Sequence, residues 1–289
     1  MTAAPAALGE GPLAIVCGSG SLPLAIADSV SARGRPVVLF PLHGTADAAG
    51  IARYPHHWLY IGQAGKFIRL ARAAGCHDVV LIGAMVRPAL WQIRPDLTML
   101  MAFHRIVAAF RGGDDHLLSA IGRLLERHGF RLLGAHDVAP EILMPQGALG
   151  ATRPNDSDRA DIALALDYLR AAGPFDVGQA VVVADRHVLA VEAAEGTDAM
   201  LARVADMRTS GRVRGPAGRG VLVKAPKSGQ DRRFDLPSIG PQTVEGAARA
   251  GLAGIAVTAG STIVAEPEQL IAAANQANIF VIGAIETES

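Results

Sequence analysis

The sequence predicts an α/β protein built from two parts. Short apolar runs alternate with helix-like stretches along the chain, and glycine stands at many of the junctions. In the first half this alternation has the spacing of β–α–β units, which is typical of a doubly wound parallel sheet. A stretch rich in glycine, proline and polar residues, at 145–156, predicts a linker. We therefore expect one domain over 1–150 and a second over 151–289.

The first half opens with a strand, predicted over 13–17 because five apolar residues follow one another without interruption. A Gly-Ser-Gly-Ser turn leads from it into a helix whose apolar positions repeat at i, i+3 and i+4 and which ends near Gly34. The other elements expected in this half are strands at 37–42, 58–61, 79–83 and 130–133, and helices at 67–74, 97–110 and 114–128.

The second half opens with a helix predicted over 158–172, which has one apolar face. Two valine-rich runs around a turn at Asp185 and Arg186 then indicate a β-hairpin. The elements expected after the hairpin are a helix at 198–204, a strand at 221–223, a helix at 243–250, short strands around 255 and 263, a helix at 267–277 and a strand at 279–282.

The composition argues against several classes of partner. Lysine plus arginine number 27 and aspartate plus glutamate also number 27, so no net charge attracts nucleic acid. Aromatic residues make up 4% of the chain, too few to suggest platforms for stacking bases. No apolar run reaches the length of a membrane span, and the first residues lack the features of a secretory signal. Cys17 and Cys76 fit reduced, buried thiols, so we expect a cytoplasmic protein.

The turn after the first strand is a candidate contact for phosphate, because backbone N–H groups at a helix N-terminus attract anions. As a dinucleotide fingerprint it is incomplete. Pro23 stands where the third glycine belongs, and no acidic residue ends the second strand. A plain βα turn and a phosphate or sugar contact both remain open, whereas an NAD-dependent oxidoreductase is disfavoured.

The stretch 220–240 combines a short apolar strand with a charged loop. A short strand ends at Lys224, and the loop beyond it carries Lys227, Arg232, Arg233 and Asp235. Loops held by a rigid strand are where binding and catalytic groups tend to lie. The cations suit a phosphorylated ligand, and a carboxylate beside them suits a metal ion or an activated water. A solvated surface loop with scattered ion pairs is the alternative.

A second acidic group lies where a strand gives way to a helix, at Glu192, Glu195 and Asp198, with Thr197 among them. Carboxylates are the ligands that Mg²⁺ prefers. The alternative is an ordinary helix cap, in which Thr197 or Asp198 satisfies free N–H groups. Asp114 and Asp115 have the same pattern after two glycines, and there we favour capping.

His136 follows a strand and Gly134, where ligands often bind in α/β sheets, although a lone histidine is more often structural. Other sites lack their signatures. The nine histidines show no H-E-x-x-H spacing, and two cysteines cannot form a thiolate zinc cluster. Neither a G-x-S-x-G elbow nor a phosphate-binding P-loop is present.

Several motifs together resemble one known family, the LpxI type of UDP-2,3-diacylglucosamine pyrophosphatase. The resemblance runs from Leu13 to Ile285. The motifs that carry it are GSGSLP at 18–23, GGDD at 112–115, GAH at 134–136, DVGQ at 176–179, VEAAEGTDAM at 191–200, KAPK at 224–227 and DLPSIG at 235–240.

The resemblance implies a Rossmann-like N-terminal domain, a distinct C-terminal α/β domain and a substrate cleft between them. It implies Mg²⁺-dependent (or Mn²⁺-dependent) hydrolysis of the pyrophosphate of UDP-2,3-diacylglucosamine, giving UMP and 2,3-diacylglucosamine 1-phosphate (lipid X), in the lipid A pathway of a Gram-negative bacterium. Water is expected to attack the sugar-side phosphorus. The family's essential aspartate falls on Asp235. Ala84 departs from the polar residue expected after Gly83, which puts a substrate contact there in doubt.

Residues and resemblance together give one expected site. Asp235 and Lys224 are the expected catalytic residues, and Asp235, Glu192 and Glu195 the expected metal ligands. The expected substrate-binding residues are Gly18, Ser19, Gly20, Ser21, Lys227, Gly178, Gln179, Thr197, Asp198 and His136, with Leu90, Trp91, Ile93 and Leu97 as candidates for the acyl chains.

We further expect transient contact with the inner leaflet of the membrane, and a homodimer is left open. A non-catalytic protein that binds a nucleotide sugar or lipid is the alternative function, although Asp235, Lys224 and the acids at 192–198 argue against it.

Overall fold

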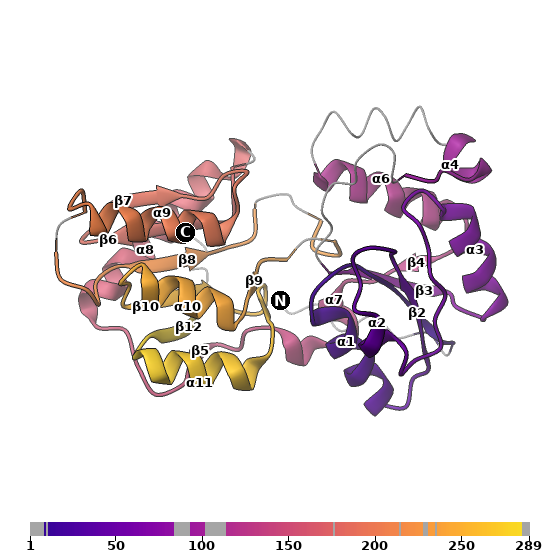
Figure 1. The fold of residues 1–289 in the computed structure, drawn as a ribbon, viewed down its shortest axis with the longest axis horizontal. Helices are drawn as coiled ribbons and strands as arrows, with labels where there is room; N and C mark the ends of the chain where they lie inside the picture. Colours follow the sequence, from indigo (N-terminus) through magenta and orange to yellow (C-terminus); the bar gives the residue numbers. More distant parts are fainter. Residues whose placement is uncertain are drawn as a thin grey trace. The chain divides into compact units, whose positions relative to one another are not determined.

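The computed structural model describes residues 9, 11–83, 93–101, 114–175, 177–213, 215–227, 231–234 and 236–284, with the backbone alone at 114–117. The chain forms two compact units (Figure 1). The first comprises residues 1–140 together with 231–235, and the second comprises 141–230 and 236–289. The division therefore follows Pro140 rather than Gly150. A short segment of the second half also belongs to the first unit.

The first unit contains a parallel sheet of four strands in the order β2-β1-β3-β4. Its strands are β1 (Leu13–Cys17), β2 (Val37–Pro41), β3 (Asp78–Ile82) and β4 (Arg131–Leu132). Its longer helices are α1 (Leu22–Ala32), α3 (Ala64–Ala73) and α6 (Asp114–Arg127).

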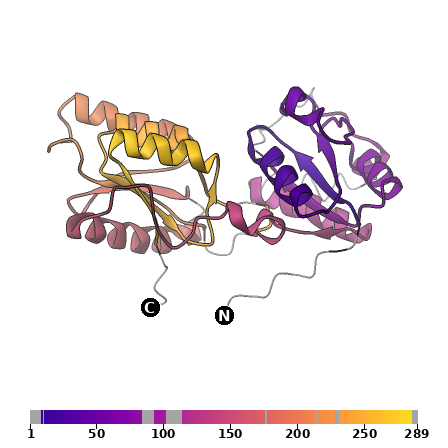
Figure 2. The same ribbon diagram turned by 90° about the horizontal axis from the view of Figure 1, so that it is seen from below.

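Both faces of this sheet are covered. Ala14 of β1 packs in one core with Phe67 of α3 and Leu125 of α6. The neighbouring Leu13 and Ile15 point to the opposite face and are also fully buried. Helix α1 packs on β1 and β2 there (Figure 2). The predicted α/β fold with a Rossmann-like parallel sheet is confirmed.

The strand predicted at 58–61 is reduced to isolated bridges beside β2. Leu39 pairs with His56 and Leu42 pairs with Leu59, both in parallel. Between them stands Pro41, whose ring nitrogen carries no hydrogen and cannot donate to the neighbouring segment. The carbonyl of Pro41 still accepts from the amide of Leu59 at 2.9 Å. The missing donor therefore interrupts a ladder that otherwise continues.

The second unit contains a mixed sheet of six strands in the order β5-β12-β10-β8-β6-β7. Strands β8, β10 and β12 are parallel, and the other pairings are antiparallel. The strands are β5 (Gly147–Leu149), β6 (Ala180–Ala184), β7 (His187–Val191), β8 (Val221–Lys224), β10 (Gly254–Thr258) and β12 (Phe280–Ala284). Two short strands, β9 (Ser238–Ile239) and β11 (Ile263–Val264), form a separate parallel pair.

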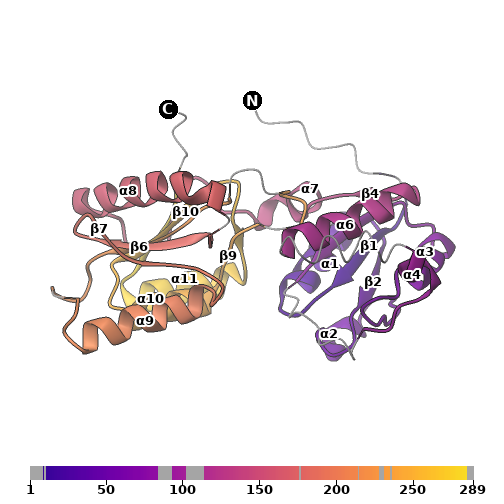
Figure 3. The same ribbon diagram turned by 90° about the horizontal axis from the view of Figure 1, so that it is seen from above.

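Four helices within the described ranges cover this sheet. One face packs against α9 (Thr197–Thr209), α10 (Pro241–Arg249) and α11 (Pro267–Ala277), and the other against α8 (Asp156–Ala172) (Figures 2 and 3). The alternation along the strands explains the two cores. Val182 of β6 faces α9, α10 and α11, whereas the adjacent Val181 and Val183 face α8.

The predicted hairpin is confirmed. Its turn residues Asp185 and Arg186 have φ angles of 49° and 63°, the left-handed values that a tight two-residue hairpin turn requires. Asp161 of α8 accepts hydrogen bonds from both turn amides, at 3.1 and 2.7 Å. This buried carboxylate therefore holds the hairpin against α8.

Two expectations for the second half need correction. The stretch expected as a linker contains β5, which extends the sheet by pairing with β12. Strand β9 was not predicted, because a two-residue strand beside Pro237 has no periodicity to detect. The short helical segments are α2 (Ala48–Ile51), α4 (Leu97–Met101), α7 (Ala135–Val138) and the 3₁₀ turns Pro140–Ile142 and Gly173–Phe175. The rest of the helix expected at 97–110 lies outside the described residues. No helix in the described ranges combines the length and apolarity needed to cross a membrane.

Candidate functional site

Lys224 ends β8 at the carboxyl edge of the second sheet. Its side chain is 8% exposed, so its ammonium group is largely removed from water. The Nζ atom donates to the hydroxyl of Thr197 and to the carbonyl of Ser238, both at 3.0 Å. Because α9 and β9 each supply one acceptor, the cation is held in one position by two elements.

Glu192 is linked to this cation through the hydroxyl of Thr197. Its Oε1 accepts from the hydroxyl of Thr197 at 2.7 Å. An ammonium group can only donate and a carboxylate can only accept, so the hydroxyl accepts from Lys224 and donates to Glu192. We call Lys224, Thr197 and Glu192 the lysine network. It places one buried positive charge in a fixed orientation, which suits binding of an anionic group.

Gly178 and Gln179 complete this corner of the second unit. The backbone amide of Gln179 donates to Oε2 of Glu192 at 2.7 Å, and that of Gly178 donates to the Glu192 carbonyl at 3.0 Å. A Cβ atom at position 178 would lie 2.5 Å from that carbonyl oxygen, so only glycine fits there. Five of the residues singled out in the sequence are therefore brought together, and both glycine and glutamate have a structural role.

The acids expected as metal ligands do not converge in the described residues. Both oxygens of Glu192 accept from protein donors, and Glu195 pairs with Arg203 at 2.7 Å. Asp198 is exposed on the first turn of α9. Within the described ranges, no group of three or more His, Cys, Asp or Glu side chains could hold a metal ion. The described acids therefore do not fit a Mg²⁺ site.

The capping role expected of Thr197 or Asp198 is also not observed. Gly196, which has no side chain, is the N-cap residue of α9, so neither Thr197 nor Asp198 occupies that position. Thr197 instead directs its hydroxyl to Glu192 and receives Lys224.

In the first unit, the turn at Gly18 lies at the carboxyl ends of β1 and β3, where the strand order reverses. Ligands bind at such points in open α/β sheets. Gly83, after β3, has a φ of 102°, and a Cβ atom there would lie 2.9 Å from the Cα of Gly18. Both the backbone angle and the space therefore require glycine. The ends of β1 and β3 therefore lie close together at this point.

A small cavity of about 40 Å³ lies at this edge. It is lined by Gly18 and Gly83, by apolar residues of β1 and β3, by Leu118 of α6, and by Phe234. Phe234 comes from the second half of the sequence, within the segment that belongs to the first unit. The sequence expectation for this loop named its charged residues and missed the aromatic one, although a phenylalanine after two arginines was the available signal.

His136 lies in α7, just after β4. Burial lowers its pKa, and the carboxylate of Asp137, 3.5 Å from its Nε2, opposes this effect. Arg232 lowers the pKa further, whereas Asp231 raises it. The imidazole therefore lies near charges from the same 231–234 segment, and it is not part of the lysine network of the second unit.

The other expected site residues are placed as follows. Lys227 is half-buried, and Gly20 turns the chain with a φ of 95° beside Ser19 and Ser21. Asp235 lies outside the described residues, as do Ala84, Leu90 and Trp91, so their expected roles stay predictions. Leu97 is exposed on α4. The expected position of the substrate between the two domains also stays a prediction.

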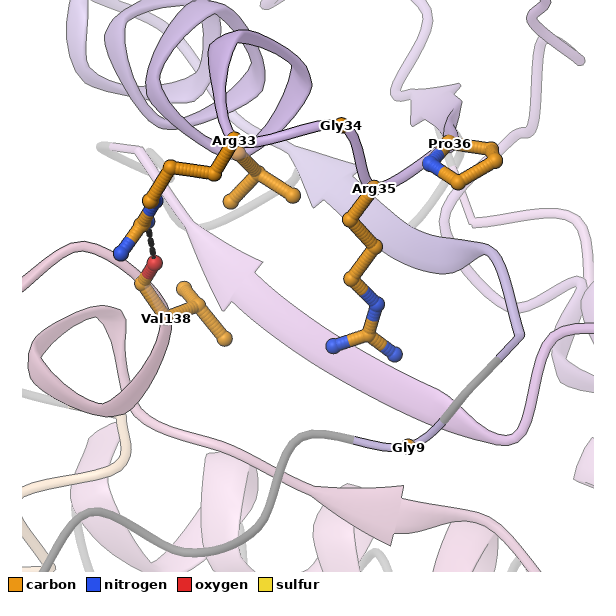
Figure 4. A pocket seen from close by; sticks show the side chains of 7 residues that line it. Gly9, Arg33, Gly34, Arg35, Pro36 and Val138 are labelled. Carbon is orange, nitrogen blue, oxygen red and sulfur yellow. Dashed lines mark hydrogen bonds between the residues drawn. The ribbon is translucent and has the colours of Figure 1, made fainter.

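A larger cavity, of about 270 Å³, lies at the opposite edge of the first sheet and contains none of the expected site residues. Arg33 and Arg35 extend into it from the turn after α1, and the Arg33 guanidinium donates to the carbonyl of Val138 (Figure 4). Arg35 also donates to Asp78 at 2.6 Å, and Asp78 receives Arg131 at 2.7 Å. Arg35 and Arg131 therefore meet on Asp78, at the amino-terminal end of β3.

The fold and these residues define a class: an α/β protein of two sheet-containing units, with candidate binding residues at the carboxyl edge of each sheet. The chain belongs to the LpxI family. Residues 12–142 match the LpxI N-terminal domain, and residues 145–282 match the LpxI C-terminal domain. A protein of Caulobacter vibrioides named UDP-2,3-diacylglucosamine pyrophosphatase LpxI is 43% identical over 271 residues, covering 94% of this chain and 96% of that protein.

Solved structures give weaker similarities. The UDP-glucose 4-epimerase of Thermus thermophilus in complex with NAD is 15% identical, with 96% of this chain and 85% of that chain covered and a TM-score of 0.32. The Brucella ovis UDP-glucose 4-epimerase in complex with NAD is 14% identical, with 38% and 31% covered and a TM-score of 0.26. These scores are too low to carry an argument.

Proposed function

We propose that this protein is a hydrolase that cleaves the pyrophosphate of UDP-2,3-diacylglucosamine, giving UMP and 2,3-diacylglucosamine 1-phosphate (lipid X). The observation that carries the proposal is the 43% identity to the Caulobacter vibrioides pyrophosphatase over 94% of the chain. The matches to both LpxI domains agree with it.

Lys224 has the clearest role in this proposal. Breaking a phosphorus anhydride requires stabilisation of negative charge on the departing phosphate, and a pre-positioned cation supplies it without reorganisation. The ammonium of Lys224 is buried and held by Thr197 and Ser238. The turn at 18–21, which leads into α1 at the carboxyl edge of the first sheet, is proposed to contact a phosphate or the sugar.

Asp235 is proposed as the catalytic aspartate, either accepting the proton of the attacking water or ligating a metal ion. A divalent cation, Mg²⁺ or Mn²⁺, belongs to the proposal as a source of charge neutralisation. Glu192 and Glu195 are not proposed as its ligands, because protein donors already bind their carboxylates. The proposal therefore assigns no step of the reaction to the metal.

The test is UMP release from UDP-2,3-diacylglucosamine, with Mg²⁺ and with EDTA, by the wild type and by Asp235→Asn. We expect release that depends on both the metal and Asp235. A folded wild type that releases no UMP would favour the alternative, a protein that binds a nucleotide sugar or lipid without turnover. Full activity of Asp235→Asn would retain the reaction and overturn the proposed catalytic residue.

We further propose that the enzyme works in the cytoplasm and touches the inner leaflet only transiently, to collect a lipid-like substrate. The exposed side chains of Leu97, Leu100 and Met101 on α4 support such contact. Co-sedimentation with vesicles should be weak and should fall further in Leu100→Ser. Analytical ultracentrifugation distinguishes a monomer from the homodimer.

A further inference from the structure

The turn at residues 231–234 lies in the segment 231–235, which belongs to the first unit although the chain on both sides of that segment belongs to the second. We call these four residues the docking turn. It is closed by a hydrogen bond from the amide of Phe234 to the carbonyl of Asp231 at 3.0 Å. The carboxylate of Asp231 also receives Nε and Nη2 of Arg233, at 3.0 and 2.7 Å. The turn is therefore stiffened by its own contacts.

The aromatic ring of Phe234 enters a slot on α6. Gly122 forms the floor of this slot, because a Cβ atom there would lie 2.5 Å from Cζ of Phe234 and 2.8 Å from Cδ1 of Leu132. Phe234 also packs against the core shared by α3, α6 and the sheet. Glycine at position 122 leaves space for an aromatic ring at the cost of helix propensity.

The slot lies at the carboxyl edge of the first sheet. Phe234 lines the small cavity there together with Gly18 after β1 and Gly83 after β3. This is the crevice in which open α/β sheets bind their ligands. A side chain of the protein itself therefore occupies part of that crevice.

An ion pair forms a second attachment. Nη1 of Arg233 lies 2.7 Å from Oε1 of Glu126, also on α6. Both side chains are more than a third exposed, so water screens this pair and its contribution is small. The packing of the half-buried Phe234 ring against the buried Gly122 is thus the main attachment.

We propose that Phe234 is a positioning residue for the reaction. Seated above Gly122, it fixes the backbone immediately before Asp235 at the carboxyl edge of the first sheet, beside the Gly18 turn. This inference rests on the proposed function, since it assigns Asp235 its catalytic role. It explains why glycine stands in the middle of α6 and why an aromatic residue follows Arg232 and Arg233.

The test uses Gly122→Ala, whose added methyl group meets the ring of Phe234. Alanine has a higher helix propensity than glycine, so α6 itself should not be weakened. Trypsin reports docking, because it cleaves after Arg232 and Arg233, which are unchanged in this variant. The rate of cleavage is proportional to the fraction of molecules in which the turn is undocked. We therefore expect trypsin to cleave folded Gly122→Ala at these residues about tenfold faster than the wild type.

The rate of UMP release tests whether the docked turn positions the reacting groups. In Gly122→Ala we expect kcat for UMP release to fall by about 10²-fold, as for other small misplacements of a reacting group, with KM changed less than about twofold. The double variant Gly122→Ala/Phe234→Leu, with a shorter side chain above the new methyl, should recover much of the lost kcat and the resistance to trypsin. Glu126→Gln, which removes only the screened ion pair, is the matched control and should resemble the wild type.

Two results would overturn the proposal. Faster tryptic cleavage with an unchanged kcat would show that docking does not position the reaction, and a Phe234→Leu variant that loses activity without faster cleavage would contradict the docking itself. A wild type without UMP release would end the proposed function and, with it, the positioning role. Trypsin would still decide, independently, whether the turn is docked through Gly122.

Discussion

Replacing a threonine by valine is expected to have opposite effects on stability at Thr197 and Thr258 of the second unit. Thr197→Val removes the hydroxyl that accepts from Lys224 at 3.0 Å and donates to Glu192 at 2.7 Å. Hydrogen bonds to charged groups contribute about 1.5–3 kcal/mol each. Both lost contacts involve a charge, so we expect the free energy of unfolding of the second unit to fall by about 3 kcal/mol.

Thr258, at the end of β10, is 5% exposed, and within the described part of the chain its hydroxyl has no hydrogen-bond partner. A buried hydroxyl without a partner costs about 1–3 kcal/mol. Thr258→Val keeps the shape of the side chain and removes this cost. We therefore expect it to stabilise the second unit by about 1 kcal/mol.

Urea unfolding followed by circular dichroism measures both effects. With an m-value of about 2 kcal/mol/M, the midpoint for the second unit should fall by about 1.5 M in Thr197→Val and rise by about 0.5 M in Thr258→Val. Thr197→Ser, which keeps the hydroxyl, is the control. Both tryptophans, Trp58 and Trp91, lie in the first unit, so the transition seen by their fluorescence should not move. Equal midpoints for wild type and Thr197→Val would refute the reasoning.

Three further outcomes are expected. Asp78→Asn removes the buried carboxylate shared by two arginines and should lower the free energy of unfolding by about 3 kcal/mol. Burial raises the pKa of Asp78, but the two arginines outweigh this effect and hold the pKa below 3.8. In the wild type this stabilisation should therefore be present above pH 3.8 and should be lost as the pH falls through the folded-state pKa. The lowered pKa of His136 predicts an NMR titration midpoint below 6.5, and protonation should destabilise the fold below that pH; a midpoint above 6.5 would contradict this. Burial raises the pKa of Cys17 to about 12 and that of Cys76 to about 11, so neither should react with a disulfide reagent at pH 8 before unfolding.

Most elements of the fold could be predicted because local patterns specify them. The run at 13–17 and the valines around Asp185 and Arg186 are strands by composition, and the turn between the latter is short enough to fix the hairpin. The predictions from sequence fail where one residue, or a strand distant in the sequence, determines whether a segment forms a strand. Pro41 interrupts a ladder through one missing N–H group, and β5 is a strand because β12 offers it an edge.

The sequence predicts which residues form the candidate site better than it predicts what each of them does. Lys224, Thr197 and Glu192 could each be picked out by their charge or their place at a strand end. The Glu192 carboxylate accepts hydrogen bonds from Thr197 and Gln179. These contacts join different elements, so the spacing of residues in the sequence does not reveal them. The sequence therefore suggested a metal ligand at Glu192, whereas in the structure its carboxylate accepts from Thr197, which in turn accepts from Lys224.

The placement of the docking turn has a consequence for synthesis on the ribosome. Residues 1–140 emerge first, but the slot above Gly122 is filled by Phe234, which is translated about 90 residues later. At about 5–20 residues per second, the first unit waits roughly 5–20 s with an open apolar slot at its sheet edge. The nascent N-terminal half is therefore incomplete on its own, and it reaches its final packing only when most of the second unit has been made.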